Sequence, residues 1–390
     1  MIKTLTVSRA TAGFIQRGHP WVRPDRFTRG LERLTAGQAV DLTDDQGKAV
    51  ASALVDPGDE ICARVYDFKP SQPFHVPTFI ERAWRRRGSL HSEVKTDSYR
   101  IVHGEADSLP GLRVERYGQV LVVLILAECA ASYAPAVCAA LHTHLPTARI
   151  VLRQHTEDLR KTPTEAKLWT PKGLVDLPPA ETTVPAKELG ITYPVRPFAG
   201  LATGLYVDQR ATRVWLRPYV KGKRVLNLFA YTGAFSLSAL AAGATSATDV
   251  DLAAPSLTIA SETAAANGLA DRHSVIQGDA RAVLAGLNEQ FDVIICDPPT
   301  AAQGGDGWVA RRDYPELLKQ AWNHLTPGGL LVAASNTIHG KPLPLKDWVA
   351  ACGPDGEALT APGLGPDLPQ LPGFPEGRPF QLATRRHVPR

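Results

Sequence analysis

Three acidic residues that follow apolar runs are the side chains of this sequence best suited to bind a small polar ligand. Asp251, Asp279 and Asp297 each stand at the end of a short run that predicts a buried strand. Ligands of open α/β sheets bind beyond the carboxyl ends of the strands. Each acid taken alone is better explained as an exposed turn residue, but three in succession predict one site.

The segment 225–251 must position the first of these acids. Residues 225–229 predict a strand, 231–233 a turn, and 234–242 a helix packed on a sheet. A second short strand ends at Asp251, which completes a βαβ unit with close to the acid spacing of dinucleotide-binding proteins. The G-x-G-x-x-G motif, whose glycines let the backbone approach a pyrophosphate, is absent. A ligand with a ribose but no phosphates therefore fits better.

S-adenosylmethionine (SAM) is such a ligand. Its carboxylate can lie at the N-terminus of the helix that begins at Ala234, where free N–H groups and the helix dipole favour an anion. Asp251 can accept both ribose hydroxyls, and Asp279 suits the adenine amino group. The sequence thus predicts a SAM site at the edge of a parallel sheet.

The composition narrows the class of protein. A chain of 390 residues predicts two or three domains. Its five cysteines are odd in number and include no C-x-x-C pair, which argues against a disulfide framework and a zinc ribbon, so no metal is expected and a cytoplasmic protein fits best. The start has no long apolar region, and the longest apolar run, 120–127, is far too short to span a bilayer.

Basic residues are dense in the first part of the chain, although the net charge of +4 does not demand a nucleic-acid partner. Residues 1–69 predict a small β-rich domain, and its first half combines arginines with Trp21 in a pattern that suits RNA. A solvated basic edge explains the charge equally well. A predicted helix over 79–90 carries a second cluster, Arg82, Arg85, Arg86 and Arg87.

A series of short motifs resembles a known family. The matching stretches are 18–22, 102–107, 109–112, 203–210, 227–233, 267–269, 297–299 and 374–377. Each is weak alone, but in this order they resemble the PUA-domain family of large-subunit ribosomal RNA cytosine-5 methyltransferases, which are class I SAM-dependent enzymes.

The resemblance implies an α/β chain of three domains. These are a PUA-like RNA-binding domain over 1–69, a middle α+β domain over 74–178, and a Rossmann-like SAM-dependent methyltransferase domain over 180–390. It also implies SAM as cofactor and a base of ribosomal RNA, 23S in this family, as substrate. The oligomeric state stays open, with a homodimer among the alternatives.

The predicted site residues fall into three groups. Those predicted to bind SAM are Gln209, Arg210, Asn227, Phe229, Tyr231, Thr232, Gly233, Ala234, Phe235, Asp251, Asp279, Ala280 and Asp297. Those predicted to act in catalysis are Asp297, Pro298, Pro299, Thr300 and Asn336. Those predicted to bind RNA are Arg17, Trp21, Arg23, Arg26, Arg29, Arg85, Arg86, Arg311 and Arg312. Gln209 and Arg210 are assigned by the resemblance, and a structural role at a helix start is their alternative.

The chain departs from this family at the nucleophile. Enzymes that methylate cytosine C5 first add a cysteine thiolate to C6, because C5 alone is too weak a nucleophile. The family's cysteine follows the fifth strand, where this chain reads Ala-Ala-Ser-Asn-Thr over 333–337. Cys296 precedes Asp297 on a strand and should therefore face the opposite side. Cys296 and Cys352 are both predicted to be structural.

Two further hypotheses follow from that departure. A ring nitrogen such as guanine N7 needs no covalent catalyst, because positioning and desolvation can suffice. The Asp-Pro-Pro-Thr and Ser-Asn stretches also resemble the family's guanine-N7 relatives. The alternative from another class is a catalytically inactive RNA-binding or ribosome-assembly factor.

Overall fold

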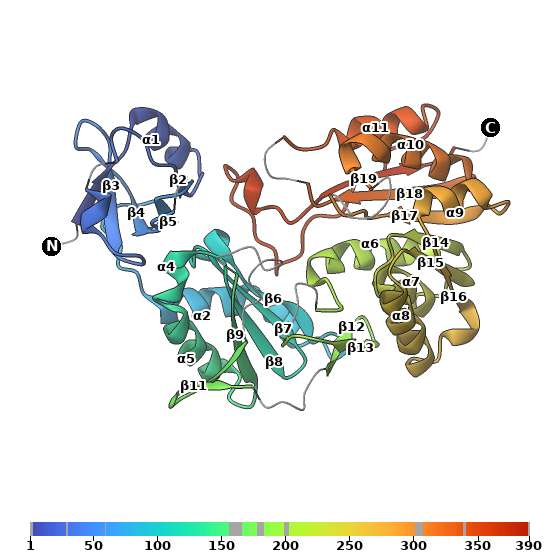
Figure 1. Ribbon diagram of the computed structural model, residues 1–390, viewed down its shortest axis with the longest axis horizontal. Helices are drawn as coiled ribbons and strands as arrows, with labels where there is room; N and C mark the ends of the chain where they lie inside the picture. The colour runs from blue at the N-terminus through green and yellow to red at the C-terminus, as the bar shows by residue number, and fades with distance from the viewer. Residues whose placement is uncertain are drawn as a thin grey trace. The chain divides into compact units, whose positions relative to one another are not determined.

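The computed structural model describes residues 3–28, 30–58, 60–155, 166–177, 183–198, 203–300, 307–337 and 341–388. The chain divides into two units (Figure 1). The first comprises Met1–Ala186, Val195–Thr203 and Gly365–Gly377, and the second comprises Lys187–Pro194, Gly204–Leu364 and Arg378–Arg390. The three predicted domain ranges stay a prediction.

The first sheet of unit 1 has the strand order β1-β3-β4-β5-β2. Its elements are β1 (Lys3–Thr6), α1 (Arg9–Gln16), β2 (Trp21–Val22), β3 (Ala39–Thr43), β4 (Ala49–Val55) and β5 (Ala63–Asp67). β1 pairs with β3 in parallel, and the other pairs are antiparallel. Alternating apolar residues such as Leu5, Val40 and Val65 face one buried core with Ile15 of α1.

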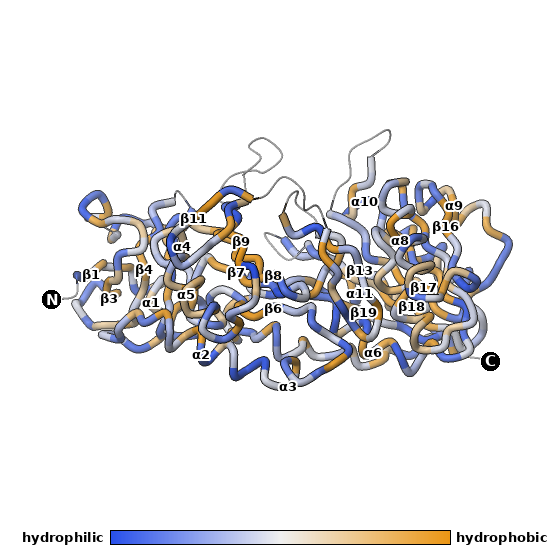
Figure 2. The backbone as a smooth tube through the Cα atoms, turned by 90° about the horizontal axis from the view of Figure 1, so that it is seen from below, coloured by the Kyte–Doolittle hydropathy of each residue, from blue (hydrophilic) through white to orange (hydrophobic). Residues whose placement is uncertain are grey.

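The second sheet of unit 1 has the strand order β11-β10-β9-β8-β7-β6. Its strands are β6 (Ser98–His103), β7 (Leu112–Tyr117), β8 (Val120–Ile125), β9 (Arg149–Gln154), β10 (Lys167–Thr170) and β11 (Gly173–Asp176). Its helices are α2 (Val76–Arg86), α3 (Gly88–His91), α4 (Glu128–Ala131) and α5 (Ala134–His144). α2 and α5 share one apolar core with β6–β9. Every residue of β8 is apolar and buried, whereas β7 and β9 also carry charged residues, so the tube of this sheet shows both hydrophobic and hydrophilic stretches (Figure 2).

The segment Gly365–Gly377 returns to unit 1 late in the chain. The buried guanidinium of Arg87 donates from Nη2 to the carbonyl oxygen of Asp367 at 3.0 Å. The Phe374 ring packs edge-on against Trp21, with ring centroids 4.8 Å apart. This segment therefore completes the packing of the first unit, although most of its neighbours in sequence belong to the second.

Unit 2 is a six-stranded sheet in the order β16-β15-β14-β17-β18-β19. Its strands are β14 (Arg224–Leu228), β15 (Ser246–Asp251), β16 (His273–Gln277), β17 (Phe291–Cys296), β18 (Leu325–Ser335) and β19 (Gln381–Arg386). Among these pairs, only β18–β19 is antiparallel. The chain runs outward from β14 to β16 and then crosses to β17 on the other side of β14. This reversal creates a topological switch point, where open sheets bind their ligands.

Helices cover both faces of this sheet. They are α6 (Arg210–Val220), α7 (Ala234–Ala241), α8 (Ala254–Ala266), α9 (Ala280–Gly286), α10 (Ala310–Asn323) and α11 (Leu345–Cys352). α6, α7 and α8 lie on one side, and α10 and α11 lie on the other (Figure 1). The hairpin of β12 (Val184–Glu188) and β13 (Ile191–Val195) stands where the chain passes from the first unit to the second. The predicted α/β fold class is confirmed.

Candidate functional site

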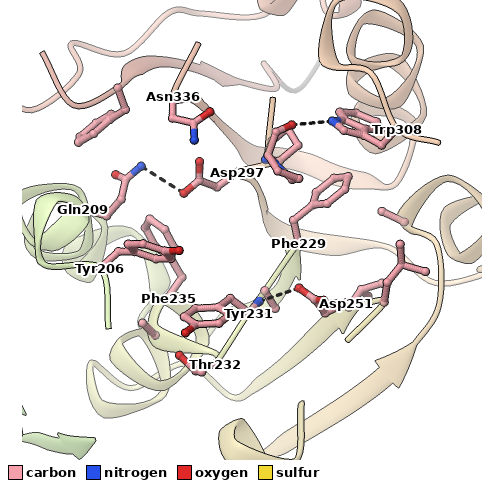
Figure 3. A pocket seen from close by; sticks show the side chains of 18 of the residues that line it. Tyr206, Gln209, Phe229, Tyr231, Thr232, Phe235, Asp251, Asp297, Trp308 and Asn336 are labelled. Carbon is pink, nitrogen blue, oxygen red and sulfur yellow. Dashed lines mark hydrogen bonds between the residues drawn. The ribbon is translucent and has the colours of Figure 1, made fainter. Parts of the chain in front are cut away.

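A cavity of about 430 Å³ lies at the carboxyl ends of the parallel strands of unit 2, at the switch point (Figure 3). This volume is in the range of small-molecule sites. Ten of the thirteen residues predicted to bind the cofactor line it, namely Gln209, Phe229, Tyr231, Thr232, Ala234, Phe235, Asp251, Asp279, Ala280 and Asp297. Pro298, Pro299 and Asn336 from the predicted catalytic group also line it.

The turn after β14 has an unusual backbone. Phe229, Tyr231 and Gly233 have φ angles of +59°, +51° and +74°, in the left-handed region. At Gly233 a Cβ atom would lie 2.4 Å from the carboxylate of Asp249, so only glycine fits. The turn ends at the N-terminus of α7, whose free N–H groups suit an anion.

The three predicted residues that do not line the cavity have other places. Gly233 forms the turn, and Arg210 is buried at the start of α6. Asn227 is buried and donates from Nδ2 to Asp249 Oδ1 at 2.8 Å. Asp249, which the sequence reasoning missed, also accepts from Ser236 Oγ at 2.5 Å and lies 2.8 Å from His273 Nε2. This buried cluster supports the turn from beneath.

The Asp251 carboxylate is held by two hydrogen bonds and keeps acceptor sites for a ligand. Its Oδ2 accepts from the backbone N–H of Tyr231 at 2.8 Å, and its Oδ1 accepts from that of Ala253 at 2.9 Å. A carboxylate has about four lone-pair sites. One acceptor site on each oxygen therefore stays available for a diol, which is the arrangement that a ribose requires.

The Asp279 carboxylate accepts more hydrogen bonds from within the protein than that of Asp251 does. As the N-cap of α9, its side chain accepts from the backbone N–H groups of Arg281 and Ala282. The Arg281 guanidinium also donates to it, from Nε to Oδ1 at 3.0 Å and from Nη2 to Oδ2 at 2.9 Å. The hydrogen bond from Arg281 lowers the pKa of Asp279. Arg281 lines the cavity and was missed by the sequence reasoning. The contact of Asp279 with an adenine amino group stays a prediction.

Asp297 lines the cavity and lies between Gln209 and Asn336 (Figure 3). Desolvation, with a smaller effect of the nearby Asp208 carboxylate, raises its pKa to about 7. Gln209 Nε2 donates to Asp297 Oδ2 at 3.2 Å. The other end of that amide is also fixed, because Thr212 Oγ1 donates to Gln209 Oε1 at 2.8 Å.

The segment that follows Asp297 is fixed by two aromatic side chains. Trp308 Nε1 donates to the carbonyl oxygen of Pro299 at 2.8 Å. The fully buried Tyr314 hydroxyl lies 2.7 Å from the carbonyl oxygen of Cys296 and 2.9 Å from that of Ala334. One carbonyl belongs to the last residue of β17, directly before Asp297, and the other directly precedes Ser335, the last residue of β18. Tyr314 therefore ties the two strand ends together.

Thr300 does not line the cavity, but it contacts a residue that does. Its Oγ1 donates to Asn336 Oδ1 at 2.8 Å and lies 3.0 Å from Thr337 Oγ1. Asn336 stands at the end of β18, in the stretch where the family's nucleophile was expected.

All five cysteines belong to the part of the chain that the structure describes, and none lines this cavity. Cys62, Cys129, Cys138 and Cys296 are buried, and Cys352 is half-buried. Burial raises the pKa of every thiol, to about 11 for Cys62 and Cys352 and about 12 for Cys138. Cys296 packs in the core beneath the strand end. No group of three potential metal ligands occurs among the described residues.

The predicted RNA-binding residues of unit 1 are of two kinds. Arg17, Arg23 and Arg26 are exposed, whereas Trp21 donates from Nε1 to Glu105 Oε1 at 2.8 Å. Arg29 lies outside the described residues.

The remaining predicted arginines make internal contacts. In unit 1, Arg85 pairs with Glu81 along α2, and Arg86 pairs with the buried Asp107. In unit 2, Arg311 donates to the carbonyl oxygen of Lys341, and Arg312 pairs with Asp313.

The cavity, the turn before α7 and the sheet order define a class I, SAM-dependent methyltransferase. A family model of S-adenosylmethionine-dependent methyltransferases matches residues 178–364, and a model of PUA-like domains matches 5–68. "Ribosomal RNA large subunit methyltransferase I" of Shigella boydii is 33% identical over 339 residues, covering 85% of each chain. The protein of that name from Escherichia coli O139:H28 is 33% identical over 341 residues, with the same coverage. The chain therefore belongs to this family of methyltransferases, and SAM is its cofactor.

Solved structures agree with the fold. A methyltransferase structure complexed with SAH has a TM-score of 0.81 at 23% identity, covering 99% of this chain and 100% of that one. A SAM-dependent methyltransferase from Agrobacterium tumefaciens has a TM-score of 0.55 at 23% identity, covering 77% and 92%. Among the described residues, no helix combines the length and apolarity that a membrane crossing requires.

Proposed function

We propose that this protein methylates a base nitrogen of large-subunit ribosomal RNA without forming a cysteine adduct. The observation that carries the proposal is the composition of the cavity. Asp297 and Asn336 occupy the ends of β17 and β18, and all five cysteines lie elsewhere. The ribosomal RNA substrate is inferred from the names of the relatives and from the PUA-like domain.

The chemistry of the thiols supports a reaction without covalent catalysis. A thiolate, rather than a thiol, is the nucleophile in an adduct with C6 of a pyrimidine. Burial raises the pKa of each thiol here to about 11 or above, so all five are neutral at pH 7. Carbon-5 of cytosine would then lack its activating group.

A base nitrogen makes no such demand. SAM supplies the electrophilic methyl group, and a nitrogen with a free lone pair can attack it directly. The task of the protein is then to hold the base in line and to exclude water. The backbone ties made by Tyr314 and Trp308 fix the strand ends that would do this. Guanine N7 is the nitrogen that we favour.

Methylation of RNA from a strain that lacks this gene tests the proposal. Purified protein is incubated with labelled SAM and the strain's ribosomal RNA, and the methylated nucleoside is identified by mass spectrometry. We expect 7-methylguanosine from the large-subunit RNA. The appearance of 5-methylcytidine would overturn the proposal. RNA binding without incorporation would favour the alternative of an inactive RNA-binding or assembly factor.

A further inference from the structure

We infer that Asn336 and Asp297 form a donor–acceptor pair that selects guanine over adenine and cytosine. Both side chains line the cavity, and Figure 3 shows the amide nitrogen of Asn336 pointing toward the Asp297 carboxyl group. The inference rests on the proposed function, because it concerns the base that enters the same cavity. It adds the residues that determine the identity of that base.

The polarity of Asn336 is set by its neighbours outside the cavity. The Thr300 hydroxyl donates to Asn336 Oδ1 at 2.8 Å. A hydroxyl has one hydrogen, so Thr300 must accept at its 3.0 Å contact with the Thr337 hydroxyl. The amide oxygen of Asn336 thus accepts from Thr300, which orients the amide so that its Nδ2 group, which can only donate, points toward Asp297 (Figure 3).

The polarity of the Asp297 side is set in the same way by a second threonine. Thr212 donates to Gln209 Oε1 at 2.8 Å, which turns Gln209 Nε2 toward Asp297 Oδ2 at 3.2 Å. Gln209 therefore presents a donor, and Asp297 is used as an acceptor. The Gln209 amide donates to Oδ2 alone, which leaves the Oδ1 atom of Asp297 to accept from a ligand.

An adjacent donor and acceptor recognise one type of base edge. Guanine presents the acceptor O6 beside the donor N1–H, which matches Asn336 Nδ2 and the Asp297 carboxylate. Adenine presents an amino group beside the acceptor N1, and cytosine presents an amino group beside N3, so in the same orientation both have the reverse polarity. Turning either base over would restore the match, but it would move N7 of adenine from the Asn336 side to the Asp297 side, and cytosine has no N7. Flipped bases are read by hydrogen bonds to this edge. A mismatched base would leave buried polar groups unpaired.

Uracil shares the guanine pattern through O4 and N3–H, but it offers no ring nitrogen with a free lone pair. Guanine offers N7, which lies beside O6 on the major-groove edge and stays unblocked when O6 and N1–H are held. The pair thus favours the base whose N7 can be methylated without a cysteine adduct. Asn336 is in this view a specificity-determining residue, and Thr300 is a positioning residue.

Isosteric substitutions test this arrangement in the full-length protein, with ribosomal RNA from the deletion strain as the probe. Asn336→Asp replaces the donor by an acceptor and should lower kcat/KM for guanine methylation about 100-fold or more, by analogy with the loss of a polar contact in a transition state. Thr300→Val removes the hydroxyl that orients the amide and should cost roughly tenfold. Thr300→Ser keeps the hydroxyl and should restore most of the rate.

Two controls separate specificity from folding. Asn323→Asp makes the same change at an exposed position at the end of α10 and should leave the rate unchanged. The affinity for SAM, measured by calorimetry, should change less than about twofold in all four variants, since a purely structural defect would weaken it together with the rate.

The outcomes distinguish the inference from the proposed function. If the wild-type protein makes 7-methylguanosine and Asn336→Asp retains its rate within twofold, the inference is overturned while the proposed function stands. Adenine methylated on a ring nitrogen by the wild-type protein would overturn the inference and the choice of guanine N7, while methylation of a base nitrogen without a cysteine adduct would stand. If the product is 5-methylcytidine, both fall.

Discussion

The cavity of unit 2 and the basic segments of unit 1 use charge in opposite ways. In the cavity, the described residues donate two hydrogen bonds to Asp251 and one to Asp297, and both carboxylates line open volume. In unit 1, the buried Asp107 is saturated by Arg86, Arg87 and the backbone N–H of His103. A charge that is held but not saturated can bind a ligand, whereas a saturated one stabilises the fold.

The same distinction divides the arginines of unit 1. Arg86 makes one of the ion pairs with Asp107, and Arg87 is fully buried beside it. Arg23 and Arg26 stand exposed on the first domain. Arginines cluster in both places, with four within 17–29 and four within 82–87, so clustering along the chain does not separate cations that support the fold from cations that can meet RNA.

Removal of the Asp251 carboxylate should have the largest effect and tests the cavity side of this comparison. Asp251→Ala deletes the predicted acceptor for two ribose hydroxyls, and each charge-assisted hydrogen bond contributes about 1.5–3 kcal/mol. The affinity for SAM should therefore fall roughly tenfold or more. Calorimetry measures it, with the exposed Asp271→Ala as the matched control. An unchanged affinity in folded protein would remove Asp251 from the site.

The positions of the strand-end acids could be predicted because parallel strands that follow one another end at the same edge of a sheet. That rule required only the apolar runs and the residues after them, and it placed Asp251, Asp279 and Asp297 around one cavity. The family resemblance supplied Gln209. The fold class followed from the same alternation of strands and helices.

The residues that orient these groups could not be predicted. Thr212 and Thr300 act through the side on which an amide oxygen lies, which no spacing in the sequence records. Tyr314 reaches two carbonyl oxygens on strands that are distant in sequence. The contact of Arg87 with Asp367 joins residues 280 positions apart, and neither segment has a periodic pattern that indicates it.

The pH dependence of methyl transfer sharpens the comparison next. Asp297 has a pKa of about 7, so the carboxylate that should accept from the base becomes protonated below neutrality. We expect kcat/KM to fall about tenfold per pH unit well below that value. In Asp297→Asn this acid limb should vanish, together with most of the activity. If the variant showed the same fall of rate at acid pH, a group other than Asp297 would be responsible for it.

The fall of kcat/KM at acid pH cannot come from unfolding caused by protonation of Asp297. The pKa of Asp297 is raised above its ordinary value of 3.8. Its contribution to the stability is therefore present below that ordinary value and is lost as the pH rises to about 7. Acidification from about pH 8 to about pH 6 thus makes this group more favourable to the folded state, and thermal unfolding in the same buffers checks this sign.

Replacing arginines of unit 1 should have smaller effects, on RNA binding for the exposed ones and on stability for Arg86. Replacement of Arg23, Arg26 and Arg29 by alanine should reduce the salt slope of RNA binding by about 2–3, because fewer counterions are released. Arg86→Ala should leave the slope nearly unchanged and lower the free energy of unfolding by about 1 kcal/mol, since its partner Asp107 keeps Arg87. Filter binding over a salt series and urea denaturation separate the two. If only Arg86→Ala lowered the salt slope of RNA binding, Arg86 and not the exposed arginines would be assigned to RNA binding.

The smallest effect is expected from the cysteines, and it bears on the chemistry of the cavity most directly. Cys296 is turned into the core of unit 2 and Cys352 lies on α11, while neither lines the cavity. Cys296→Ala and Cys352→Ala should therefore leave the turnover per folded molecule within about twofold, although the buried Cys296 should cost about 1 kcal/mol or more of stability. RNA that carries 5-fluorocytosine should form no denaturation-resistant complex, because trapping needs a thiolate within reach of C6. Asn336 cannot take that role, since an amide is not a nucleophile at neutral pH. A trapped complex mapped by mass spectrometry to any of the five cysteines would place a thiol in the cavity during the reaction and would restore cytosine C5 as the target.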